Sequence, residues 1–411
     1  MLTEFGTAAR QDNHDQESHS GSRMKTITRR TYLKQMAVTA AAGTFPACFC
    51  QTDVLADENE AQATPSESEA AEIARIAQQQ MEQYHAPGLS VAIARHGHLV
   101  YQRGFGYADN ASREPVTPAS LFRIASLTKP ITSVAIFTLI EQGRLQLDDL
   151  IFGAQGILKN DFVDDGGNYP DLVRKITLHH LLTHTGGGWE NDASDPMFAN
   201  LEMNHQQLIT WALRNLPLKY EPGTHYAYSN FGYCILGRVV EKITGKPYAE
   251  FVQRNVLAKC GINDMRLAGN TQADRASGEV VYYGQRGSGT NPYNMNVTRM
   301  DSHGGWIATP KDLVQFAMHV DGFKTTPNIL AAHTLKTMTT ATAANPRYAC
   351  GWSVNNIPNW WHDGSLPGTL SILVRTASGL CWAAFTNTRV EGLVLDKMMW
   401  QIVEAVPAWK A

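Results

Sequence analysis

Two kinds of apolar pattern divide the chain. Between Ile131 and Ile140 the apolar residues fall on most sides of a helix, which is typical of a buried helix. Short apolar runs bounded by turn residues predict strands near both chain ends, at 89–95, 99–106, 359–365, 370–376 and 380–387. Strands from both ends with helices between them predict an α/β (α+β) fold, in which an antiparallel sheet is flanked by helices and an all-helical region is inserted.

Start and stop signals place further elements. We expect a helix over 72–84, and another through 235–243 that ends at Gly245. Thr309-Pro310 begins a helix, and a closing helix runs from about Gly392 to Ala405. The stretch from 280 to 298 is rich in Gly, Asn and Tyr, which predicts a long loop and a candidate lid.

The N-terminal segment has the features of an export signal. Residues 28–34 resemble the twin-arginine signature, an alanine-rich apolar stretch follows, and Ala56 ends a small-residue cleavage site; Met24 is an alternative start. We therefore expect an export signal over 1–56, an acidic linker over 57–70 and a periplasmic location. Lipoprotein anchoring at Cys48 is the less favoured alternative, because Phe and Pro fit poorly in the preceding box.

Composition and cysteine spacing limit the partners. A net charge of −3 over 411 residues gives no reason to expect nucleic acid, and no apolar run after the signal has transmembrane length. His180 and His184 share a helical face, but no Glu follows His180 and no third ligand is evident, so structural histidines are the better interpretation. We expect no metal and no cofactor, and we expect buried thiols at Cys234, Cys260, Cys350 and Cys381.

The candidate chemistry begins at Ser126 and Lys129. Their spacing of three places both side chains on one face of a first helical turn. A serine hydroxyl needs an adjacent base, and a lysine becomes one if burial keeps its amine neutral. With Ser126 as the N-cap, Pro130 falls in the first turn, where proline is tolerated, and the helix N-terminus favours negative charge on Ser126.

Two later motifs complete a recognisable set. Tyr228-Ser229-Asn230 precedes a helix, and His362-Asp363-Gly364 lies in a predicted strand. In this order, and with the phrases FRIASLTKPITSVAIFTLIEQGRLQLDD and EPGTHYAYSNFGYCILGRVVEKITGKPYAEF, they resemble the serine β-lactamase and penicillin-binding-protein superfamily, nearer its class C and esterase branch. The resemblance runs from about 72 to 403. It implies a β-lactamase/transpeptidase-like domain over 71–411, with an α/β part about 71–125 and 305–411 and a helical part about 126–304.

The resemblance implies a role for each matched residue. Ser126 is the nucleophile that becomes acylated, Lys129 activates it, and Tyr228 is a general base or proton shuttle. Whether Lys129 or Tyr228 takes the first proton stays open at this point, although a cation beside Tyr228 is expected to lower the pKa of its phenol. Asn230 is expected to hydrogen-bond Lys129 or a substrate carbonyl.

The third motif is expected to complete the oxyanion hole. The hole consists of the backbone N–H groups of Ser126 and Ser365, and Gly364 lets the substrate approach the strand. In β-lactamases and DD-peptidases this motif usually begins with a lysine that helps to hold the substrate carboxylate. Here His362 stands in its place, and Asp363 adds a negative charge, so both changes weaken anion capture.

These features predict a small-molecule ester, amide or peptide as substrate. The first interpretation is a periplasmic serine hydrolase that forms an acyl-enzyme on Ser126, an esterase or a peptidase/amidase. A D,D-carboxypeptidase or weak β-lactamase of cell-wall metabolism is an alternative, and a non-catalytic penicillin-binding-like module is a third. Asp363 favours a substrate that carries an amine.

Overall fold

The computed structural model describes most of the chain after the expected signal. All described residues belong to the second of the two units into which the chain divides, 57–411. The twin-arginine-like segment, Cys48 and residues 57–63 of the predicted linker lie outside them. Within the part described, no helix combines the length and the apolar character that crossing a membrane requires. The described stretches are 64–164, 167–285, 289–389 and 394–410.

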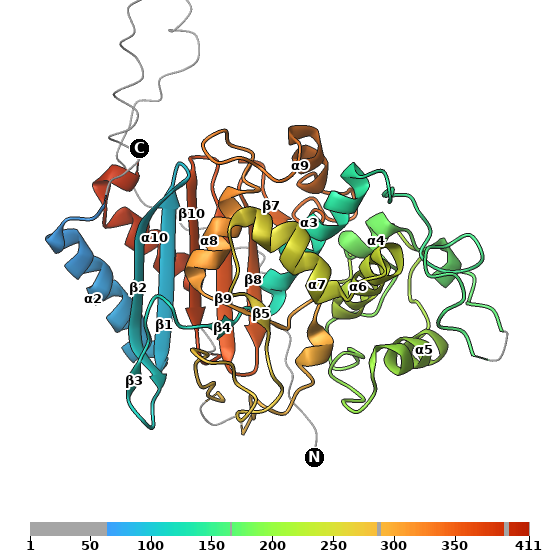
Figure 1. Cartoon of the computed structure of the whole chain (residues 1–411), viewed down its shortest axis with the longest axis horizontal. Coiled ribbons are helices and arrows are strands. Elements are labelled where there is room, and N and C mark those ends of the chain that lie inside the picture. Colours follow the sequence, from blue (N-terminus) through green and yellow to red (C-terminus); the bar gives the residue numbers. More distant parts are fainter. Residues whose placement is uncertain (1–63, 165–166, 286–288, 390–393, 411) are drawn as a thin grey trace, which may run out of the picture. The chain divides into compact units, whose positions relative to one another are not determined.

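A seven-stranded antiparallel sheet joins the two ends of the domain (Figure 1). Its order is β3-β2-β1-β10-β9-β8-β7, and β1 pairs with β10 so that Leu89 lies opposite Thr386. The predicted sheet built from both chain ends is therefore confirmed. The strands are β1 (Gly88–Arg95), β2 (His98–Asp109), β3 (Glu114–Pro115), β7 (Ser353–Val354), β8 (Trp360–Leu366), β9 (Thr369–Arg375) and β10 (Leu380–Thr386).

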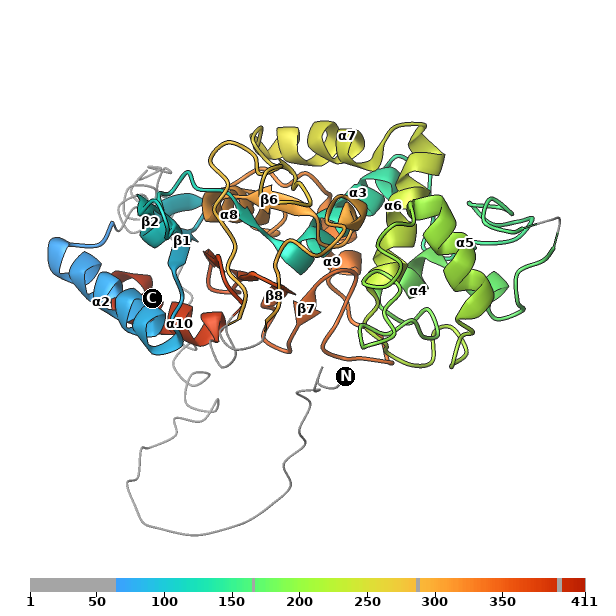
Figure 2. The ribbon, with the colours of Figure 1, turned by 90° about the horizontal axis from the view of Figure 1, so that it is seen from below.

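Helices cover both faces of this sheet (Figures 1 and 2). On one face, α2 (Glu67–Tyr84) and α10 (Leu395–Glu404) enclose a buried cluster that includes Val91 of β1. On the other face lies α8 (Pro310–Met318), and Ala92 of β1 enters the main core there. Because successive residues of β1 enter two different cores, the strand is buried at every position instead of alternating between buried and exposed.

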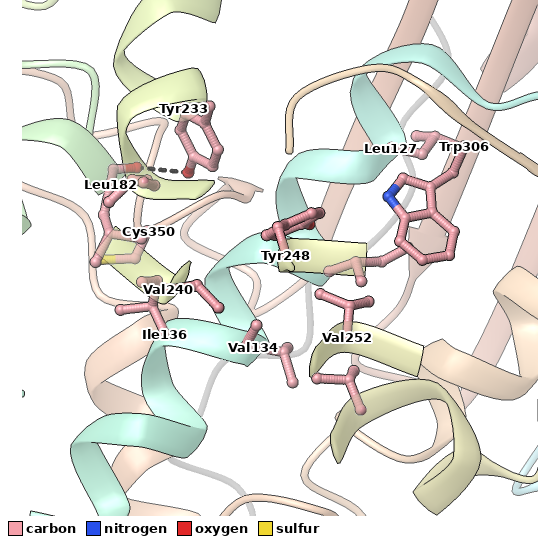
Figure 3. Packing of buried hydrophobic residues seen from close by; sticks show 14 of the residues in the cluster. Leu127, Val134, Ile136, Leu182, Tyr233, Val240, Tyr248, Val252, Trp306 and Cys350 are labelled. Atoms are coloured by element: carbon pink, nitrogen blue, oxygen red, sulfur yellow. Dashed lines mark hydrogen bonds between the residues drawn. The ribbon is translucent and has the colours of Figure 1, made fainter. Parts of the chain in front are cut away.

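The inserted helices surround α3 (Thr128–Glu141), which is buried from Thr128 to Leu139. Figure 3 shows Val134 and Ile136 of α3 packed near Val240 of α6 and Val252 of α7. The buried helix predicted from its all-round apolar sequence is confirmed, and close packing makes it a rigid base for the residues at its start. The neighbouring helices are α4 (Leu178–Leu182), α5 (His205–Asn215), α6 (Asn230–Thr244), α7 (Tyr248–Val252) and α9 (Ala332–Met338).

Several local expectations were wrong or incomplete. Ser126 is not an N-cap, because a 3₁₀ turn, η1 (Ala125–Leu127), precedes α3. Helix α2 begins at Glu67, since Ser66 and Glu69 form a capping box ahead of the expected start. Helices α5 and α9 were missed, as was a small sheet of short strands, β4 (Phe122–Arg123), β5 (Arg266–Leu267) and β6 (Trp306–Ala308).

Where the structure describes it, at 280–285 and 289–297, the predicted loop is irregular, and it is tied to the core. Arg123 Nη1 donates a hydrogen bond to the Pro292 carbonyl at 2.7 Å, and the Tyr283 N–H donates to the Asn387 carbonyl at 2.9 Å. These contacts attach the loop to Arg123, before η1, and to Asn387, after β10. A lid must be free to move, so these contacts do not favour the candidate lid. The four cysteines predicted as buried thiols are buried and free: Cys234, Cys260, Cys350 and Cys381.

We predict that Gly364→Ala loosens the contact between β8 and η1. A Cβ at this position would lie 2.5 Å from the Ile124 carbonyl oxygen and 3.2 Å from the Ala125 Cβ, and backbone cannot easily yield. The free energy of unfolding should fall by about 1–3 kcal/mol, measured by denaturant titration. Gly186→Ala is the control, because its Cβ would meet only Leu181 at an ordinary 3.5 Å. Equal stability of the two variants would contradict the tight contact.

Candidate active site

Ser126 is the one partly exposed residue in a buried run from 120 to 139. It lies in η1, at the start of the central helix. Ala125, immediately before it, has a φ of 47°, in the left-handed region that residues with a Cβ rarely adopt. The strained turn thus presents a single hydroxyl to solvent from an otherwise closed segment.

The Lys129 amine lies beneath that hydroxyl and is fully buried. Its Nζ is 3.1 Å from Ser126 Oγ, 2.7 Å from Asn230 Oδ1 and 3.1 Å from the His303 carbonyl oxygen. Burial lowers the pKa of Lys129 to about 7, although the Asp195 carboxylate acts in the opposite direction. The Asn230 and His303 oxygens only accept, so a neutral amine directs its two N–H bonds to them and its lone pair to Ser126.

Tyr228 reaches the same point from the loop before α6. The side chain of Ser229 caps this helix by accepting a hydrogen bond from the Gly232 N–H at 2.9 Å. The Tyr228 phenol interacts with the Ser126 side chain, and Lys129 Nζ lies 4.7 Å from the Tyr228 ring centroid. The predicted convergence of an alcohol, an amine and a phenol is therefore present in the structure.

The protonation of Tyr228 differs from the expectation. Burial raises the pKa of Tyr228 well above its usual value, so the phenol keeps its proton at neutral pH. The expectation of a lowered pKa was wrong, because burial removes water from the phenol and the nearby carboxylates of Asp363 and Asp195 raise its pKa further. These electrostatics favour Lys129 as the first base and leave Tyr228 as a proton donor or relay.

Both the oxygen and the nitrogen of the Asn230 side-chain amide are hydrogen-bonded within the protein. Its oxygen accepts from Lys129, and its Nδ2 donates to Asp195 Oδ2 at 2.8 Å and to Asn191 Oδ1 at 3.0 Å. Of the two partners expected for Asn230, the structure therefore shows Lys129, and neither amide hydrogen is left for a substrate carbonyl. Asp195 was missed from the sequence, because an acid in a loop rich in Gly, Asp and Ser resembles an ordinary surface turn.

His362 lies in a directed chain of hydrogen bonds. The Ser229 N–H donates to His184 Nδ1 at 3.0 Å, so the proton of neutral His184 is on Nε2, 3.1 Å from the Tyr348 hydroxyl. That hydroxyl is 3.0 Å from His362 Nε2, and His362 Nδ1 is 2.6 Å from the Asp363 carbonyl oxygen. Each donor thus meets an acceptor when both imidazoles are neutral.

This chain changes the interpretation of the third motif. Burial, with Lys129 nearby, lowers the pKa of His362 to about 3, so the imidazole carries no charge at neutral pH, as expected. Because both of its ring nitrogens have protein partners, His362 supports the site from within instead of binding the substrate. His184 is confirmed as a structural histidine, whereas Tyr348, the hydroxyl between them, was missed from the sequence.

Gly364 brings the sheet to the nucleophile. Because Gly364 has no Cβ, Ile124 and Ala125 can pack closely against it. The segment that approaches Gly364 is therefore η1, whereas we had expected the substrate to approach it. The short β7 pairs only with Trp360 and Trp361 of β8, which leaves the outer edge from His362 to Leu366 without a strand partner in the described parts of the chain. Ser365 lies on this edge beside η1, so the oxyanion hole at Ser126 and Ser365 stays a prediction consistent with the fold.

Two acidic groups and the predicted histidine pair complete the electrostatic description. The protein around the Asp363 carboxyl removes part of its hydration, and this loss, together with the nearby Asp396, raises the pKa of Asp363 to about 6. The residue itself is exposed at the edge of β8.

His180 Nδ1 accepts a hydrogen bond from the Thr177 N–H at 3.2 Å, which is a capping contact. In the described stretches, no three His, Cys, Asp or Glu residues gather as metal ligands would.

Comparisons with known proteins show what this chain is similar to. The family model described as Beta-lactamase matches residues 73–405. Penicillin-binding protein 4* of Bacillus subtilis (strain 168) is 27% identical over 313 residues, which cover 70% of this chain and 64% of the relative. Esterase EstB of Burkholderia gladioli is 32% identical over 205 residues, 47% of this chain and 50% of the relative. The chain thus spans at most about two thirds of the curated relatives.

Solved structures share the fold at low sequence identity. D-amino acid amidase from Ochrobactrum anthropi SV3 is 22% identical with a TM-score of 0.69, covering 84% of this chain and all of the amidase. D-alanine carboxypeptidase AmpC from Burkholderia cenocepacia is 19% identical with a TM-score of 0.63, covering 83% of this chain and all of the carboxypeptidase. These likenesses confirm the β-lactamase/transpeptidase-like architecture.

We predict that kcat/KM for an uncharged ester rises with pH through about 7. Raising the pH removes the proton from Lys129, whose pKa is about 7, so the fraction of free amine increases. Below this value the rate should fall by at least about tenfold per pH unit. Lys129→Arg, which stays charged, should be at least about 10²-fold slower. A wild-type acid limb centred near pH 4 would contradict this assignment and indicate a carboxylate base.

Proposed function

The chain belongs to the Beta-lactamase family, and we propose that it is a serine hydrolase that cleaves esters or amides through an acyl-enzyme on Ser126. One observation carries the proposal. Ser126, the only partly exposed residue in the segment 120–139, has its Oγ 3.1 Å from the Nζ of the buried Lys129. A buried amine with a pKa near working pH is a suitable base for a serine nucleophile.

The proposed reaction uses this arrangement in two stages. Lys129 takes the Ser126 proton as Oγ bonds to the carbonyl carbon, and the N–H groups of Ser126 and Ser365 stabilise the resulting oxyanion. The proton passes from Lys129 through Tyr228 to the leaving group, and the bond from the carbonyl carbon to that group breaks. Water then attacks the acyl ester, gives a proton back through the same groups and releases Ser126 with its hydroxyl restored.

The charges near Ser126 favour a substrate that lacks a carboxylate. His362 is neutral, so the site lacks the cation that would hold an anionic group at this position. Asp363 is largely ionised above its pKa of about 6 and favours a substrate amine. Amino-acid amides or esters with a free amino group are therefore the proposed class, and a related fold is found in a D-amino acid amidase.

The second candidate function is D,D-carboxypeptidase or weak β-lactamase activity in cell-wall metabolism. It is supported by likeness to a penicillin-binding protein and, in fold, to a D-alanine carboxypeptidase. Intact Ser126, Lys129 and Tyr228 argue against a non-catalytic binding module. The twin-arginine-like segment at 28–34 supports a periplasmic location, which is part of the proposal.

We predict a burst of product from a chromogenic short-chain ester, with one equivalent released per enzyme before the steady state. Acylation of Ser126 releases the chromophore before water attacks the acyl-enzyme. Ser126→Ala should abolish the burst and reduce turnover by at least about 10³-fold. Ser194→Ala, an exposed serine outside the reacting set, is the control. Intact-protein mass spectrometry with no acyl adduct on wild type under any ester, amino-acid amide or penicillin would refute the acyl-enzyme.

We predict that Asp363→Thr increases turnover of a carboxylate-bearing β-lactam about tenfold and lowers turnover of an amino-acid amide by a similar factor. The variant removes a negative charge from the edge of β8 and leaves a hydroxyl there. A neutral ester, measured on the same variant, should react as before and is the internal control. If the turnover of all three substrates is unchanged, Asp363 does not select the charge of the substrate.

A further inference from the structure

Asp195 is a buried carboxylate that the proposed reaction does not use directly. It is 1% exposed and lies in the loop between α4 and α5. Its Oδ1 accepts from the Met197 N–H at 2.9 Å, and its Oδ2 accepts from Asn230 Nδ2 at 2.8 Å. A buried charge of this kind is costly unless it is hydrogen-bonded, and here both oxygens have donors. One of these donors directly contacts the catalytic lysine.

The carboxylate fixes the direction of the Asn230 amide. An amide side chain presents oxygen on one side and NH₂ on the other, and the two ends have nearly the same shape. An ionised carboxylate accepts only, so it selects the orientation in which Nδ2 faces Asp195 and Oδ1 faces Lys129. In the reverse orientation, two N–H donors would face the amine, and carbonyl oxygen would face a carboxylate.

The other partner of Asn230 cannot make this selection. Asn191 is exposed, and its own amide can present either oxygen or NH₂ to Asn230. Its backbone N–H donates to the Tyr228 carbonyl at 2.8 Å, so the loop that carries Asp195 also contacts the chain at the phenol. Apart from Lys129 itself, Asp195 is thus the one described partner of this amide whose ionised group can only accept.

We propose that Asp195 is a positioning residue for catalysis: its carboxylate holds the Asn230 oxygen toward Lys129 and so directs the lysine lone pair to Ser126. This inference rests on the proposed function, because it assumes that Ser126 is the nucleophile. The chain of contacts is Asp195 to Asn230, Asn230 to Lys129, and Lys129 to Ser126, with each step within hydrogen-bond distance.

Asp195 also acts on Lys129 by charge. Its field raises the pKa of Lys129 in opposition to burial, which lowers it to about 7. The charge of Asp192, on the same loop, acts on Asp195. The charge of Asp195 in turn acts on Tyr228, before α6, and on Arg299, which donates hydrogen bonds to carbonyl oxygens of the following loop residues. Burial raises the pKa of Asp195 itself to about 6. Protonation there adds an O–H donor and removes the constraint on the amide.

The test is the rate at which an alkyl fluorophosphonate labels Ser126, measured from pH 4.5 to 9. This probe needs no knowledge of the natural substrate. Asp195→Asn offers only one acceptor oxygen for two donors, so the labelling rate at high pH should fall about tenfold or more. Its acid limb should also move to lower pH by about half a unit to one unit, because the charge that raised the pKa of Lys129 is gone. Asp148→Asn, which removes an exposed charge outside the contacts of Asn230 and Asp195, should change neither quantity.

Wild-type protein supplies a second measurement that needs no buried substitution. Below about pH 6, both Lys129 and Asp195 take up protons, so the slope of log rate against pH should exceed one. A wild-type slope of one, or an Asp195→Asn profile that falls in height without moving, would overturn the proposal and leave Asp195 a structural residue. Absence of labelling in wild type would overturn the proposed function itself, and this inference with it.

Discussion

The burial of one amine is the constraint on which the site depends. Lys129 lies in the first turn of a helix packed on all sides, where a charged ammonium is poorly solvated. The protein supplies two acceptor oxygens and leaves the third direction to Ser126. The same amine contributes to the low pKa of His184 and of His362, so the imidazoles around it stay neutral and form hydrogen-bond chains in place of a second cation.

The site forms where the two parts of the domain meet. The nucleophile and its base come from η1 and α3, the phenol and amide from the start of α6, and the open edge from β8. A glycine at 364 allows the sheet to approach η1 closely enough to align these parts. Catalytic geometry of this kind is therefore a property of packing between elements, because no single element contains more than two of the groups.

Much of this arrangement could be predicted from the sequence, and the missing parts have a common cause. Strands at both chain ends and an all-round apolar helix are patterns along the chain, so the sheet and α3 followed from them. Asp195 and Tyr348 are near the other groups only in the folded chain, and neither lies in a periodic pattern. The phenol was assigned the wrong pKa because sequence shows a neighbouring charge and does not show the loss of water around it.

The pairing of β1 with β10 has a consequence for synthesis. A ribosome releases β1 about three hundred residues before β10, so the nascent domain has an apolar strand with one edge unpaired until β10 has been made. Loop closure over such a separation makes the last pairing step slow relative to local helix formation. A chain that stops short of β10 therefore lacks the middle of its sheet, and its newly exposed edge is a template for aggregation.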